Sequence, residues 1–178
     1  MMTRIARALR RFRRKEEGSA IVIEFVIFVP ILFSAFLMAT ELGIYSMRQM
    51  FLDRGLDIAV RHIRLNTGLS ITHRQIKDMI CDNAGFLEDC DDTLRLEMIP
   101  IDLRAFATFD MTPDCVDTSA AVQPVRGFTL GQAQQMMMMR ACVKFNPVFP
   151  TTGIGKYLEK DGSGKARMLA TAAFVQEP

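Results

Sequence analysis

An uninterrupted apolar run near the start of the chain constrains its fold more than any other feature. Residues 20–39 read AIVIEFVIFVPILFSAFLMA and contain one charged side chain, Glu24. At about 1.5 Å per residue, a helix of this length matches the roughly 30 Å hydrocarbon core of a bilayer. The apolar region of a cleaved secretory signal is shorter, at about 7–15 residues. The run therefore predicts a transmembrane helix, in which Pro30 would be tolerated as a kink.

Charge is distributed unevenly on the two sides of this run. Residues 1–18 contain seven basic and two acidic side chains, a net charge of +5, which leaves −3 for the rest of a chain whose total is +2. Basic residues are retained on the cytoplasmic side of membranes, so we expect the N-terminus in the cytoplasm and the chain after the run outside it. The positive charge lies on a tail and not on a folded surface, so nucleic acid is not expected as a partner.

All the cysteines follow the apolar run. They are Cys81, Cys90, Cys115 and Cys142. An even number of cysteines in an exported region predicts two disulfides, with three pairings compatible with the sequence. We favour the pairing of sequence neighbours, Cys81 with Cys90 and Cys115 with Cys142. Because no CxxC pair and no adjacent histidine occurs, no zinc or other metal site and no cofactor is expected.

Beyond the run, the helical pattern continues before it gives way to strands. Apolar residues at three- and four-residue steps predict an amphipathic helix that ends near Gly68. Its inward residues are Ile44, Met47, Phe51, Leu52, Leu56, Ala59, Val60 and Ile63. Thr72 to Gln75 then fits a capping box that opens a short helix, with Ile76, Met79 and Ile80 pointing inward and Cys81 on it. The carboxylates of residues 88–92 lack the spacing of a calcium loop, so a solvated turn is favoured there.

Three strands are predicted in the second half of the chain. The first contains Leu94, Leu96 and Met98 on one face and ends at Pro100. The second starts at Met136, with Met137, Met139, Ala141, Val143 and Phe145 on one face and Met138, Arg140, Cys142 and Lys144 on the other. Its four methionines invite a copper hypothesis, but neighbouring residues of a strand point to opposite faces, so core packing is favoured. A third strand, 166–175, follows the turn at 160–165, and residues 110–131 are predicted to form an irregular loop held by Cys115.

These elements predict an α+β fold, in which a single N-terminal transmembrane helix continues into the amphipathic helix and packs on a small antiparallel sheet. No enzymatic activity is expected. Gly164-Lys165 lacks the earlier glycine and the following Ser or Thr of a phosphate-binding loop. His62 and His73 have no partnered acid or cysteine in a recognisable spacing, so we expect them at the surface or in a cap.

Glu24 is the residue of the apolar run that most requires an explanation. A carboxylate in the hydrocarbon costs a few kcal/mol, less near the end of the span. One interpretation is that Glu24 reaches the cytoplasmic interface or is protonated there. The other is that it pairs with a cation from another chain, such as a new α-amino group made by cleavage just before the run.

Residues 16–25, EEGSAIVIEF, resemble the prepilin processing region of the TadE-like family of minor pilins from tight-adherence (Flp) pilus systems. That region has a basic leader, a small residue before the cut, four mostly apolar residues and then Glu before an aromatic. Cleavage after Gly18 would make Glu24 the sixth mature residue, and cleavage after Ser19 the fifth, as in the family. The resemblance extends to Phe25–Pro30, Glu41–Gly43, Met50–Gly55, Pro147–Gly155 and Glu177–Pro178.

The resemblance implies a pilin-like fold and a role as a minor pilin or pseudopilin in pilus assembly. It divides the chain into a cytoplasmic leader (1–18), a transmembrane helix (19–40) and an extracytoplasmic domain (41–178). The implied location is the inner membrane, with the domain in the periplasm. The implied partners are the lipid bilayer, other pilus subunits, the inner-membrane assembly platform and a prepilin peptidase. The alternative is an uncleaved single-pass protein whose exported domain binds a partner in an envelope assembly complex.

Overall fold

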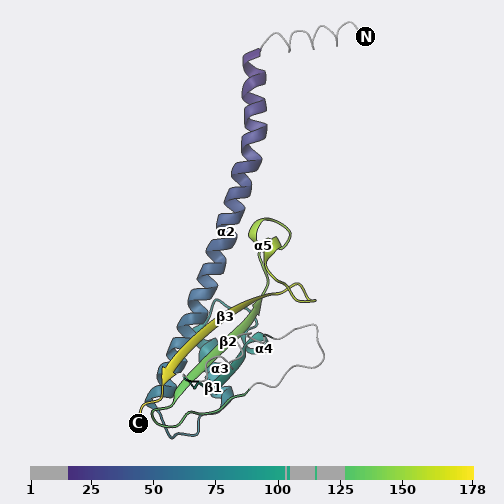
Figure 1. Cartoon of the computed structure of the whole chain (residues 1–178). Coiled ribbons are helices and arrows are strands. Elements are labelled where there is room, and N and C mark those ends of the chain that lie inside the picture. The colour runs from purple at the N-terminus through teal and green to yellow at the C-terminus, as the bar shows by residue number, and fades with distance from the viewer. Residues whose placement is uncertain (1–15, 103, 105–114, 116–126) are drawn as a thin grey trace. The chain divides into compact units, whose positions relative to one another are not determined.

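A computed structural model describes residues 16–102, 104, 115 and 127–178 of the chain. The chain divides into two compact units, Met1–Thr40 and Glu41–Pro178. One helix, α2 (Glu16–Leu65), contributes residues to both units (Figure 1). The remaining described elements all belong to the second unit, which has an α+β fold.

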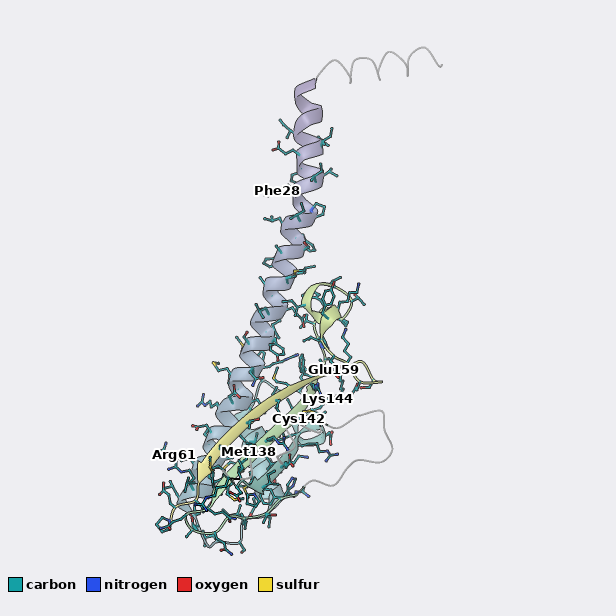
Figure 2. The ribbon with its side chains drawn as sticks, in the orientation of Figure 1. Phe28, Arg61, Met138, Cys142, Lys144 and Glu159 are labelled. Atoms are coloured by element: carbon teal, nitrogen blue, oxygen red, sulfur yellow. A yellow bond between two sulfur atoms is a disulfide. The ribbon has the colours of Figure 1, made fainter. Side chains whose placement is uncertain are left out.

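Residues 21–40 form the apolar part of α2, in the first unit. Nearly all of their side chains are exposed, as Figure 2 shows for Phe28, which is 62% exposed. The hydroxyls of Ser34 and Thr40 each donate to a helix carbonyl three or four residues earlier, at 2.9 Å. Pro30 lies inside the helix without ending it. Within the described part of the chain, α2 is the one helix long and apolar enough to cross a membrane, and its most apolar window is unburied.

Residues 41–65 of the same helix pack into the core of the second unit. The predicted inward residues Leu52, Leu56, Ala59, Val60 and Ile63 are all buried. Met47 was expected with them but is 45% exposed. The buried apolar residues of α2 begin only at Leu52. The helix ends at Leu65, close to the expected Gly68.

Helix α3 (His73–Asn83) begins at the predicted capping box. The Thr72 hydroxyl accepts the Gln75 backbone N–H, and the Gln75 side chain accepts the Thr72 backbone N–H in return. Ile76 and Ile80 are buried in the core cluster, and Met79 is half-buried against it. The amphipathic pattern of this helix therefore sets which side faces the core.

In the described part of the chain, the sheet has three antiparallel strands in the order β1 (Arg95–Pro100), β2 (Met136–Phe145) and β3 (Ala166–Val175). The register places Leu96 opposite Ala141 and Ala141 opposite Ala170, so the small residue lies between its neighbours on the core face. The predicted inward faces of the first two strands are buried: Leu96, Met98, Met137, Met139, Ala141, Val143 and Phe145. They form one cluster with the buried residues of α2 and α3.

The opposite face of β2 is buried from Arg140 onwards, although it carries two charged residues, Arg140 and Lys144 (Figure 2 labels Lys144). Arg140 forms an ion pair of 2.6 Å with Glu97, directly opposite on β1. Lys144 forms one of 3.3 Å with Asp161, in the turn before β3. A buried charge is tolerated when it is paired, as both of these are. Because β2 is the central strand, β1 lies on one side of it and β3 on the other.

Two disulfides in the described structure match the favoured pairing. Cys81 of α3 bonds to Cys90, and Cys115 bonds to Cys142 of β2. The turn expected at residues 88–92 is partly helical, because Cys90–Thr93 form the short helix α4. Asp89 precedes it with a left-handed φ of 53°, and its carbonyl accepts the Thr93 hydroxyl. Most of the irregular loop expected at 110–131 lies outside the described residues.

Candidate functional site

Three of the predicted site residues, Gly18, Ser19 and Glu24, lie on α2. Glu24 is exposed, and so are its neighbours Phe25 (66%) and Phe28 (62%). The carboxylate therefore emerges from an apolar helix surface. If lipid surrounds this helix, the carboxylate lies in a medium where a charge without a partner is costly.

A second carboxylate on α2, that of Glu41, is buried at 3% exposure. Its Oε1 accepts the backbone N–H of Val148 at 3.1 Å, and its Oε2 accepts that of Phe149 at 2.9 Å. Both oxygens are thus used to hold the chain that follows β2. Charge-assisted hydrogen bonds of this kind are stronger than those between neutral groups.

Arg48, two helical turns after Glu41, holds the same segment at its start. Its side chain is buried, and Nη1 donates to the Asn146 carbonyl at 2.8 Å. The guanidinium lies 5.2 Å from the centre of the Phe145 ring, which also contacts the Tyr45 ring at 5.8 Å between centroids. Such cation–π contacts favour a fixed position of the arginine. An acid and a base on one helix face therefore position residues 145–149.

The segment held by these two residues continues into a compact loop, residues 146–160, which we call the 146–160 loop. It contains the short helix α5 (Gly153–Tyr157), which was not expected from the sequence. Gly155 lies against the Phe149 carbonyl so closely that a Cβ there would be 2.4 Å from the oxygen. Lys160 Nζ closes the loop by donating to the Pro150 carbonyl at 2.7 Å.

The far end of α2 is joined to the C-terminal residues. Gln176 Nε2 donates to the Ile63 carbonyl and to the Thr67 hydroxyl, both at 2.9 Å. Arg64 and Glu177 form an ion pair of 2.8 Å. Residues 41 to 64 of α2 are therefore connected at both ends to the segments before and after β3.

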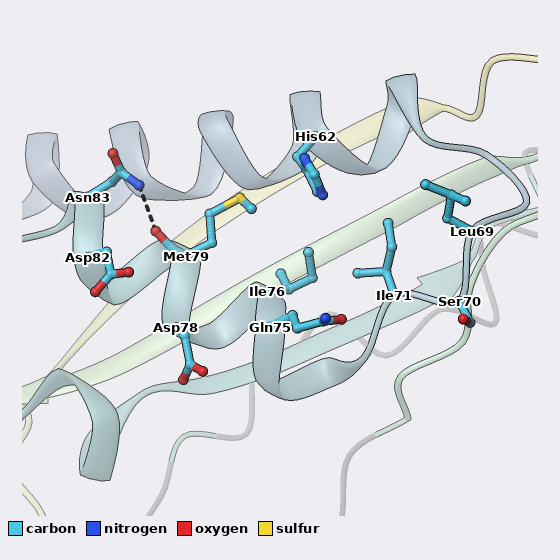
Figure 3. Close-up of a pocket in the computed structure, with 10 residues that line it drawn as sticks. All are labelled: His62, Leu69, Ser70, Ile71, Gln75, Ile76, Asp78, Met79, Asp82 and Asn83. Atoms are coloured by element: carbon cyan, nitrogen blue, oxygen red, sulfur yellow. Dashed lines mark hydrogen bonds between the residues drawn. The ribbon is translucent and has the colours of Figure 1, made fainter.

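A groove of about 630 Å³ lies between the C-terminal part of α2 and α3 (Figure 3). It is lined by both apolar and polar residues, among them Ile71, Met79, His62 and Asn83. The Asn83 side chain donates to the Met79 carbonyl at 2.8 Å, so part of the polar rim is already satisfied. In the described part of the chain, no group of three or more His, Cys, Asp or Glu side chains could hold a metal ion.

The two histidines lie on different helices, His62 on α2 and His73 on α3. His62 is exposed and contacts Asn66, just after the end of α2. His73 is the first residue of α3, where its ring lies 5.2 Å from that of Phe128 and its Nε2 is 3.3 Å from the Leu96 carbonyl oxygen. Near it, burial and the Arg95 guanidinium lower the pKa of Lys77 from its usual 10.5. These positions fit the expected surface and capping roles.

The link between Glu41 and the 146–160 loop was missed by sequence reasoning. Both segments, Glu41–Gly43 and Pro147–Gly155, were noted as parts of the resemblance, but nothing in either pattern joins residues more than 100 positions apart. The described structure brings them into contact through backbone N–H groups, which carry no sequence signal. Comparison with protein-family models, curated proteins and solved structures found no match for the chain.

Proposed function

We propose that this chain is a single-pass membrane protein that serves as a minor pilin or pseudopilin in the assembly of a tight-adherence, type IV-related pilus. The N-terminus would lie in the cytoplasm, residues 19–40 would cross the inner membrane, and the second unit would lie in the periplasm. The two disulfides fit such an oxidising compartment. The partners would be the bilayer, other pilus subunits, the inner-membrane assembly platform and a prepilin peptidase.

Glu24 is the observation that carries this proposal. It is an exposed acid on an apolar helix that continues, without a break, into a packed α+β unit. Cleavage after Gly18 or Ser19 would create an α-amino group close to the position of Glu24 in the sequence. In lipid, the amine of one subunit and the carboxylate of its neighbour would each satisfy a charge that is costly to leave unpaired. This pairing would set the axial register of adjacent helices.

The processing step is tested by the N-terminal residue of the membrane-extracted protein. Mass spectrometry should find Ser19 or Ala20 at the N-terminus in cells that contain a prepilin peptidase, and the leader still attached in cells without it. A leader that remains attached in both would refute processing and favour the uncleaved membrane protein.

The pairing step is tested by Glu24→Gln, which removes the charge and keeps the shape. We expect normal membrane insertion but a loss of subunit-to-subunit crosslinking and of assembled pili. Ser34→Ala, on the same apolar segment, is the matched control and should change neither. If Glu24→Gln assembles like the wild type, the carboxylate is not a pairing group, and the alternative, in which the exported unit binds a partner without polymerising, is favoured.

A further inference from the structure

The position of Glu41 along the chain fixes the depth of the loop that it holds. The apolar run ends at Ala39, so Glu41 lies about 3 Å further along the helix axis, at 1.5 Å per residue. Its carboxylate is bonded to the Val148 and Phe149 backbone. If residues 20–39 span a bilayer, these two loop residues must lie at its boundary, because hydrogen bonds allow no separation along the helix axis of more than a few ångströms.

Within the second unit, the loop follows α2 from Arg48 back to Glu41. It starts at Asn146, against Arg48, and reaches Phe149, against Glu41, which lies seven residues nearer the run. This corresponds to about 10 Å along the helix axis. Helix α5 then packs beside Phe149 through Gly155, and Figure 1 shows it beyond the ends of strands β2 and β3.

Three of the residues that the loop exposes are of types that favour a lipid boundary. Tyr157 is 82% exposed and Val148 is 42% exposed. Lys156 is exposed, with its Nζ 5.9 Å from the centre of the Tyr157 ring. Tyrosine is enriched at the membrane interface, and a lysine can bury its stem while its ammonium reaches lipid phosphates. Leu42, next to Glu41 on the helix, is also 51% exposed.

We infer that the 146–160 loop rests on the extracytoplasmic surface of the phospholipid bilayer that the chain's own helix crosses. Tyr157 and Val148 lie in the boundary layer, and Lys156 lies at the level of the phosphate groups. The buried Glu41 carboxylate holds the loop at this depth. The inference rests on the membrane span of the proposed function and is independent of its pilus role.

Single tryptophans test this inference, because the chain contains no Trp and each variant then reports from one place. Tyr157→Trp reports from the loop, Leu69→Trp from an exposed position after the far end of α2, and Phe28→Trp from the apolar run. Each full-length variant is reconstituted into vesicles of phosphatidylcholine and phosphatidylglycerol. Quenching is measured with two sets of lipids, brominated either near the headgroup or near the middle of the bilayer, and with aqueous acrylamide.

We expect bromine near the headgroup to remove most of the emission of Trp at 157, bromine near the middle of the bilayer to remove most of that at 28, and neither to remove much of that at 69. The inference is overturned if position 157 behaves like position 69 while position 28 is quenched by lipid, and the span then still stands. It is also overturned if position 157 is shielded from both quenchers, which would mean that protein covers the loop. If position 28 is not quenched by lipid, the proposed membrane span itself fails.

The role of Glu41 is tested by adding Glu41→Ala to the Tyr157→Trp variant. Loss of the two hydrogen bonds should release the loop and reduce quenching at 157 by lipid. Asp53→Ala, which removes an exposed acid of the same helix, is the matched control and should leave the quenching unchanged. Hydrogen exchange of β2 shows whether the second unit stays folded. If it does and the quenching is unaltered, Glu41 does not position the loop.

Discussion

The two halves of α2 share one backbone geometry but depend on different surroundings. Residues 21–40 expose their apolar side chains, whereas residues 41–65 bury a stripe of them against α3 and the sheet. The described part of the chain does not cover the apolar side chains of the first half, whereas α3 and the sheet cover those of the second half. A helix in lipid satisfies every backbone group within the segment, whereas most helices in water are stabilised by packing of one face.

The two carboxylates, Glu24 and Glu41, differ in the same way. The second unit satisfies Glu41 with two backbone N–H groups of its own. Glu24 is exposed on the apolar half. An acid in lipid requires a partner, which is why the proposed function assigns it one from a neighbouring molecule. Whether an acid on this helix is satisfied within its own unit therefore depends on what its half of the helix packs against.

The largest difference between the halves is expected from one leucine truncation in each. Leu56→Ala removes a side chain that is 2% exposed and should cost about 2–5 kcal/mol of the free energy of unfolding, because it leaves a cavity. Leu32→Ala, at 59% exposure, should leave the stability of the second unit unchanged. Urea unfolding in detergent, monitored by the hydrogen exchange of β2, measures the change in the free energy of unfolding for each variant. Equal losses would contradict the division.

A lysine substitution should affect the first half of α2 more than the second, the reverse of the leucine truncations. Phe28→Lys places a charge near the centre of the apolar run and should cost about 2.5–3.5 kcal/mol of membrane insertion. Met50→Lys, at an exposed position of the second half, should change insertion and folding by less than about 0.5 kcal/mol. Alkaline extraction of membranes measures the inserted fraction. If Phe28→Lys remained fully inserted, the first half would not be a membrane span.

Two glycines of the second half sharpen the comparison, because one touches the core and one does not. Gly55→Ala would place a Cβ 2.7 Å from the Ile80 carbonyl oxygen, so α3 must move, at a cost of about 1–3 kcal/mol. Gly43→Ala has nothing within 4 Å and should gain about 0.5–1 kcal/mol from helix propensity. Urea unfolding of the two variants should therefore give changes of opposite sign. If both substitutions were stabilising, α3 would not approach Gly55 as closely as the structure shows.

The smallest effect concerns a charge that the second unit buries in part. The pKa of Lys77 is lowered by burial and then by Arg95, despite the opposing effect of Asp91 and Asp92. Between this lowered value and the usual 10.5, the unfolded chain binds more protons than the folded one, so stability rises with pH through that window. Lys77→Met should remove this rise. Thermal unfolding of both proteins from neutral pH towards 10.5 measures it, and parallel curves would rule out the shift.

Much of the fold could be predicted because its signals are local. The apolar run, the capping box at Thr72, the alternation in Met137 and Met139, and the turn before β3 each depend on residues within a few positions of one another. The disulfides also joined sequence neighbours. Of the candidate site, the sequence identified Glu24, because one acid stands out in an apolar run.

By itself, then, the sequence determined where the chain is apolar, where it is helical or extended, and which single acid lacks a polar setting. The tertiary structure alone decided that Glu41 and Arg48 hold the 146–160 loop, that Gly55 admits the Ile80 carbonyl, and that both faces of β2 are buried from Arg140 onwards. The physical reason is separation along the chain. Periodicity arises from the repeat of one element, whereas a hydrogen bond to a backbone N–H more than 100 residues away depends on how the elements pack.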